Sequence, residues 1–142
     1  KSHLGTPLVI AFGSSYINNS GMYSYLGRFW SGCAGKAKRG LEISGIEIID
    51  LDLHICLHLE VVQTPVPSIL ETVCWTLIIG IYIVLRVRKE SLLKITSYVV
   101  ADEYFFKVTF VDGTLAMGFH VISRLRDDTS LHYLTGQSPK VG

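Results

Sequence analysis

Apolar and polar residues alternate most clearly between Leu53 and Val61, in the run LHICLHLEV. A period of two residues is typical of a β-strand that has one buried face and one exposed face. The preceding run LEISGIEIID, residues 41–50, has the composition of a second strand, with Gly45 as a candidate bulge. A short turn, DLD, separates the two runs. The pattern therefore predicts an antiparallel hairpin over residues 41–62.

Three further short apolar runs predict buried strands at Leu8–Phe12, Tyr98–Ala101 and residues 119–125. The first of these ends at Gly13 and two serines. Residues 18–40 are rich in Gly, Ser, Asn and aromatic residues, and they predict a long loop, with short irregular strands inside it as the alternative. Residues 63–68 contain two prolines, which favour an extended linker.

Two segments predict helices. The first covers residues 68–89, where Ser68 and Glu71 have the spacing of a capping box, although β-branched residues and Gly80 leave a strand open as an alternative. The second covers residues 103–117 and ends at Gly118. The resulting order is β, ββ, α, β, α, β. This order predicts an α/β fold in which helices cover a mixed sheet.

Composition narrows the class of protein. The chain has 142 residues, of which 49% are hydrophobic, and a net charge of +1. This length is typical of one domain. The net charge is too small to indicate nucleic-acid binding by the protein surface as a whole. Three cysteines without a CxxC motif fit a reducing compartment, the cytoplasm. The uncharged segment Val73–Leu85 is shorter than the roughly 20 residues of a membrane span, so a buried helix is preferred over a membrane-associated protein.

Several polar groups are candidates for chemistry. The face Asp52, His54, Cys56, His58 and Glu60 is interpreted as a solvated strand face, with a metal site as the alternative. The glycine-rich stretch SGCAGK, residues 31–36, lacks the spacing of a phosphate-binding loop. Basic residues that lie near aromatic residues suit contact with DNA phosphates and bases, and they are Arg28, Lys36, Lys38 and Arg39.

Asp102 follows the predicted strand Tyr98–Ala101 in the sequence SYVVADEYFFK. Two roles are open for this carboxylate. It can cap the helix that follows, or it can bind a metal ion at the end of the strand. A metal site for phosphoryl transfer requires further oxygen ligands besides Asp102.

Several ordered segments resemble DDE-type transposases of bacterial insertion sequences, in the insertion sequence 4-like group. These segments are LGRFWSGCAGKAKRGLEISGIEIIDLD, HLEVVQTP, YVVADEYFFK and FVDGTLAMGFHVISRLRDD. The similarity covers residues 8–133 and is weak over residues 68–90. It implies a ribonuclease-H-like fold in which Asp, Asp and Glu hold Mg²⁺ or Mn²⁺ for cleavage and strand transfer of DNA. Asp102 matches the second acid of this set.

The same resemblance implies that the site is incomplete. The first acid is expected in a stretch like VID, and the corresponding stretch here is VIA, which places Ala11 at that position. The third acid would lie beyond Gly142. We therefore expect residues 1–142 to be a single partial catalytic domain that binds the ends of a mobile element without cleaving them. The alternatives are a regulatory DNA-binding remnant that associates with an intact transposase, or a small membrane-associated protein.

Overall fold

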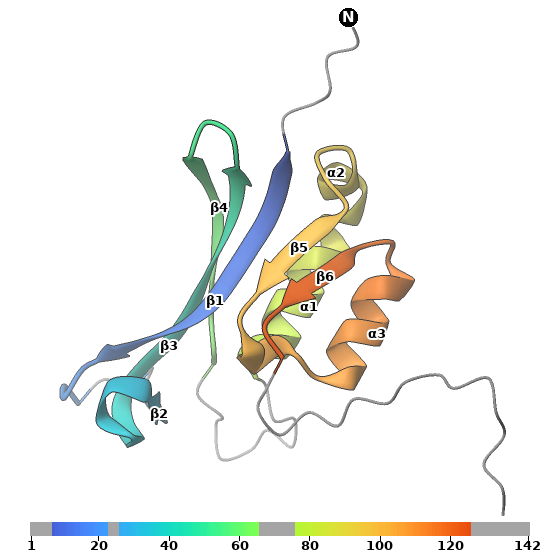
Figure 1. Cartoon of the computed structure of the whole chain (residues 1–142). Helices are drawn as coiled ribbons and strands as arrows, with labels where there is room; N and C mark the ends of the chain where they lie inside the picture. Colours follow the sequence, from blue (N-terminus) through green and yellow to red (C-terminus); the bar gives the residue numbers. More distant parts are fainter. Residues whose placement is uncertain (1–6, 23–25, 66–75, 126–142) are drawn as a thin grey trace, which may run out of the picture.

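The computed structural model describes residues 7–22, 26–65 and 76–125, which form one mixed sheet with helices (Figure 1). Three long strands form an antiparallel meander: β1 (Leu8–Asn18), β3 (Lys36–Asp50) and β4 (Ile55–Gln63). The short strand β2 (Gly27–Ser31) pairs with the first residues of β3. Two further strands, β5 (Tyr98–Ala101) and β6 (His120–Ser123), continue the sheet from β1 in parallel. The meander therefore contributes one half of the sheet and the parallel strands the other.

Three α-helices and two 3₁₀ turns connect the strands: α1 (Leu77–Val87), α2 (Lys89–Leu93), α3 (Val108–Ala116), η1 (Gly32–Ala34) and η2 (Glu103–Phe105). In Figure 1, α1 lies behind β5 and β6. The predicted α/β class, with helices against a mixed sheet, is confirmed.

The core forms between α1 and one face of the sheet. Leu77, Ile81 and Leu85 recur every four residues along α1, and each side chain is fully buried. They belong to the same buried cluster as Ile10 of β1 and Ile46 of β3. Burial of side chains of this size stabilises the fold by about 1.5–3 kcal/mol each. This packing fixes the position of the central strand β1.

An aromatic cluster completes the core near the end of β5. Phe105 is fully buried, and its ring centroid lies 5.0 Å from that of Phe12 and 5.8 Å from that of Phe110. Phe12 and Phe110 are also in contact, at 6.0 Å. The edge-to-face geometry of the pairs made by Phe12 adds to the gain from burial. The cluster ties the turn after Asp102 to the central strand.

The predicted helix over residues 103–117 is wrong in one respect. The segment begins with the 3₁₀ turn η2, and Lys107 then adopts extended backbone angles, φ −118° and ψ 139°. The α-helix begins only at Val108. The predicted stop is confirmed, because Gly118 follows the helix with φ +96°. The prediction for β5 has the observed bounds.

The predicted helix over residues 68–89 is confirmed for Leu77–Val87, where the side chain of Thr76 caps its first turn. Its proposed start at Ser68 lies outside the described residues. Gly80 lies within this helix, and a β-carbon there would lie 2.7 Å from a methyl group of Val62. Glycine thus permits close approach of α1 to β4. Within the described part of the chain, α1 and the other helices are too short or too polar to cross a membrane.

Residues 18–40 contain strands and not one long loop, so the alternative of short strands in this segment is confirmed. β1 continues to Asn18, and β2 pairs with β3 across the turn η1. Gly40 shows why the strands can meet there. A β-carbon on Gly40 would lie 2.2 Å from the carbonyl oxygen of Ile17, and the Tyr16 ring lies directly against this glycine. The Tyr16 hydroxyl donates a hydrogen bond to the carbonyl oxygen of Arg39, at 2.6 Å.

The hairpin over residues 41–62 is confirmed, but its predicted burial is wrong. The apolar residues of β4 other than Val62 are exposed, including Ile55 at 57% and Leu57 at 60%. The ladder between β3 and β4 shifts register after Ile46, so that Leu59 has no partner in β3. Such a bulge reverses the face on which later residues lie. In addition, α1 approaches β4 only near Val62, beyond the bulge.

Candidate functional site

Asp102 lies directly after β5, with an exposed side chain. One of its oxygens, Oδ1, accepts a hydrogen bond from the backbone N–H of Tyr104 at 2.9 Å. The predicted capping role is therefore confirmed, although Asp102 caps the turn η2 and not the helix α3. Only Oδ1 takes part in this cap. The other oxygen, Oδ2, is directed towards β1.

The position that faces Asp102 on β1 is Gly13. A β-carbon built on Gly13 would lie 3.7 Å from Oδ2 of Asp102. Ala11, the position that the resemblance aligns with the first acid, pairs instead with Val100, two residues before Asp102. The sequence alone could not reveal this, because the alignment of β1 with β5 decides it. Glycine has no side chain that could supply a second ligand.

Asp102 borders an open cleft of about 800 Å³ at the carboxyl end of β5. The cleft extends from the turn η2 to the second half of β1, to the first half of β3 at Glu42, and to β2. Its lining includes hydroxyl, carboxylate, aromatic and guanidinium groups: Ser14, Ser15, Tyr16, Trp30, Gly32, Glu42, Asp102, Glu103, Tyr104 and Arg124. The crevice at the carboxyl ends of parallel strands is a common location for binding sites in α/β sheets.

Tyr104 is the cleft residue with the clearest electrostatic perturbation. Burial raises the pKa of its hydroxyl, and the nearby carboxylates of Glu42 and Asp102 raise the pKa further. All three effects oppose formation of the negatively charged phenolate. Tyr104 therefore remains protonated at neutral pH and can act as a hydrogen-bond donor in the cleft. Sequence reasoning did not identify Tyr104 or Glu42 as cleft residues.

The predicted DNA-contacting residues lie on the hairpin formed by β2 and β3. Arg28 is directly opposite Arg39, and Lys36 and Lys38 occupy alternate positions on β3. Because side chains alternate along a strand, Lys36 and Lys38 lie on one face of the hairpin and the two arginines on the other. The structure thus brings all four residues onto one projecting element, in two pairs.

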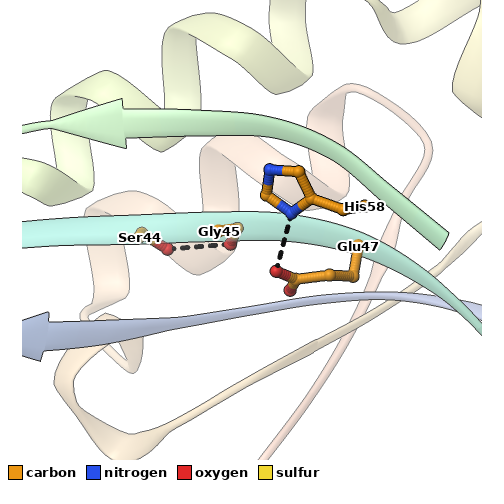
Figure 2. A network of polar contacts seen from close by, with 4 residues as sticks. All are labelled: Ser44, Gly45, Glu47 and His58. Carbon is orange, nitrogen blue, oxygen red and sulfur yellow. Dashed lines mark hydrogen bonds and ion pairs between the residues drawn. The ribbon is translucent and has the colours of Figure 1, made fainter. Parts of the chain in front are cut away.

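The polar residues of β4 do not form one cluster. His58 contacts Glu47 through its Nδ1 atom, 3.2 Å from Oε1, as shown in Figure 2. Glu60 lies beyond the bulge and pairs instead with Arg88 of the helical segment, at 2.8 Å. In the same view, Ser44 donates a hydrogen bond to the carbonyl oxygen of Gly45. Nowhere in the ranges 7–22, 26–65 and 76–125 do three His, Cys, Asp or Glu side chains form a group suited to a metal.

The other acidic residues near β3 lie far from Asp102. Asp50 pairs with Leu8 at the beginning of β1, whereas Asp102 lies beside Gly13. Five residues of strand separate these positions by roughly 17 Å. Asp50 instead accepts hydrogen bonds from the backbone N–H groups of Asp52 and Leu53 and so shapes the turn before β4. Asp50 and Asp52 are thus too distant to complete a site around Asp102.

No family model matches the chain, and a search of curated proteins gave no match. Among solved structures, the chain is similar to piggyBac transposase in a synaptic complex with hairpin DNA, with a TM-score of 0.51 and 10% identity. That alignment covers 97% of this chain and 27% of the transposase, so the chain spans about a quarter of its length. A second similarity is to endonuclease V from Ciona intestinalis bound to DNA, with a TM-score of 0.41, 9% identity and coverage of 82% of this chain and 45% of that one.

The sheet order β4–β3–β1–β5–β6 joins three antiparallel strands to two parallel ones. This arrangement agrees with the similarity to piggyBac transposase. The chain therefore has the ribonuclease-H-like fold expected from its sequence, a fold that it shares with a DNA transposase.

Proposed function

We propose that this chain is part of the catalytic domain of a DDE-type DNA transposase, of the insertion sequence 4-like bacterial group. The observation that supports this proposal best is the position of Asp102. Its carboxylate lies at the end of the strand next to β1, at the edge of an open cleft. The basic hairpin of β2 and β3 contributes Trp30 and Gly32 to the same cleft and can contact the DNA backbone.

The carboxylates of the cleft do not fit a pair of divalent metal ions. Catalysis with two metals requires several oxygen ligands that converge on them. Gly13 offers no side-chain oxygen, the carboxylate of Glu42 accepts a hydrogen bond from the hydroxyl of Thr64, and Asp102 also caps a turn. Across the described ranges these acids form no group suited to a metal ion. We infer that this chain binds DNA without cleaving it, and that it can compete with an intact transposase for DNA ends.

Purified chain is expected to show no Asp102-dependent nicking of supercoiled plasmid in Mg²⁺ or Mn²⁺. The physical reason is the incomplete ligand set around Asp102, which leaves a bound metal with too few protein oxygens. Conversion of supercoiled to open-circular plasmid on agarose gels provides the measurement, with Asp102→Asn as the matched control. Robust nicking that disappears in Asp102→Asn would show that the chain is an active nuclease.

Charge reversal on the hairpin is expected to weaken DNA binding. Lys36→Glu/Lys38→Glu should raise the dissociation constant for duplex DNA about tenfold. It should also reduce the slope of log K against log salt concentration by about 2, because each lost phosphate contact contributes about 0.9. Fluorescence anisotropy at several salt concentrations measures both quantities.

The control for this experiment is Arg86→Glu/Lys94→Glu. These two cations are exposed on the helical segment, away from the hairpin, and the substitution changes the net charge by the same amount. Affinity and salt slope should remain near those of the parent chain. Equal weakening by both double variants would mean that the hairpin has no special role in DNA binding.

A further inference from the structure

Trp30 is an exposed tryptophan at the rim of the cleft. It lies on β2, its side chain is 66% exposed, and it pairs across the hairpin with the small residue Ala37. Single exposed apolar residues are common on protein surfaces, so exposure alone does not identify a site. The groups around Trp30 are more informative.

Arg28 and Arg39 surround Trp30 with positive charge. Arg28 is two residues before Trp30 and therefore lies on the same face of β2. Arg39 is directly opposite Arg28 on β3 and shares that face. The hairpin therefore presents two guanidinium groups on the face that carries Trp30.

The combination of indole and guanidinium groups matches the chemistry of a nucleotide. Aromatic side chains stack on bases, and arginine binds phosphate in bidentate geometry. Bases within a duplex are already stacked on one another, so Trp30 can receive a base only where a nucleotide is unpaired. A partner protein is a weaker match, because two adjacent cations favour a polyanion over an apolar surface.

We propose that Trp30 stacks on an unpaired base of bound DNA, while Arg28 and Arg39 contact the neighbouring phosphates. This inference rests on the proposed DNA binding and adds the class of substrate, DNA with an unpaired segment. Trp30 and Asp102 line the same cleft, so the unpaired nucleotide would lie in the cleft that contains the carboxylate.

The test uses the full chain with Trp75→Phe, which leaves Trp30 as the single tryptophan. Oligo(dT) is expected to quench the fluorescence of Trp30, whereas a duplex of equal length should quench it much less. In anisotropy titrations, Trp30→Ala should weaken binding of oligo(dT) about tenfold and binding of duplex DNA less than about twofold. Trp30→Phe, which keeps a stacking surface, should stay within about threefold of the parent. Val87→Ala truncates an apolar side chain on α1 that is even more exposed than Trp30, and it should have no effect.

Two results would overturn the inference, and they differ in what they say about the proposed function. If Trp30→Ala binds oligo(dT) as tightly as the parent while duplex binding persists, Trp30 is not a stacking surface and the DNA-binding function stands. If the parent chain binds neither oligo(dT) nor duplex DNA at low salt, both the inference and the proposed function are wrong.

Discussion

Phe105→Ala is expected to lower the free energy of unfolding by about 3–5 kcal/mol. Phe105 is fully buried and makes ring contacts with three neighbours, Phe12, Phe110 and Tyr104. Removing its ring leaves a cavity between the central strand and the turn that carries Asp102. Urea denaturation followed by circular dichroism measures the change as a lower midpoint at an unchanged slope.

The adjacent residue provides the control for this substitution. Phe106 is only partly buried, so Phe106→Ala deletes the same group with a smaller loss of contacts. We expect this variant to lose less than about 1.5 kcal/mol. Equal losses for both variants would mean that the aromatic cluster is not a special source of stability. Because Phe105 packs behind the rim of the cleft, its loss should also lower the affinity for any ligand that binds beside Tyr104.

Gly13→Asp is expected to create a binding site for Mn²⁺. The added carboxylate would lie beside Asp102, because the β-carbon position of Gly13 is 3.7 Å from Oδ2 of Asp102. Two adjacent carboxylates repel each other, and a divalent cation between them relieves this repulsion. Sites with few ligands bind divalent cations with dissociation constants of about 0.1–1 mM. Isothermal titration calorimetry measures the affinity, and 10 mM Mn²⁺ should stabilise the variant by about 1.4–2.7 kcal/mol.

Ala11→Asp is the matched control for this prediction. It adds the same carboxylate to the same face of β1, but next to Val100 and two residues from the position that faces Asp102. Mn²⁺ should neither bind nor stabilise this variant. Adding Asp102→Asn to Gly13→Asp should abolish the new site. Equal binding by the Gly13→Asp and Ala11→Asp variants would contradict the register of β1 and β5 as the basis of the site.

Local sequence signals predicted the parts of the fold that local chemistry controls. The apolar run of β5 and the glycine stop after α3 are examples, because a short buried strand and a left-handed glycine each depend on a few adjacent residues. The hairpin of β2 and β3 was expected only as an alternative to a loop, because its polar, glycine-rich composition is typical of a loop. Its strand β3 is stabilised by pairing with β1, as the close contact of Tyr16 with Gly40 shows, and β2 in turn pairs with β3.

The candidate site was predicted in part for the same reason. Asp102 was identified because a carboxylate after a buried strand is unusual and has chemical meaning. Gly13 was not identified, because glycine carries no functional group. Only the pairing of β1 with β5, two strands distant in the sequence, places Gly13 opposite Asp102. The sequence indicated a candidate bulge at Gly45, whereas the register shift follows Ile46 and the extra residue is Leu59 of β4. This bulge divides the polar residues of β4 between two faces.

The pairing of β1 with β5 has a consequence for the order in which the molecule assembles. β1, β3 and β4 can form hairpins from neighbouring segments, but Ile10 meets its parallel partner Val99 only after most of the chain has been synthesised. Closing so large a loop is entropically costly and slows folding. Until α1 and β5 arrive, Ile10, Phe12 and Ile46 remain open to water. The nascent chain is therefore expected to expose the apolar face of an incomplete sheet, to which chaperones can bind.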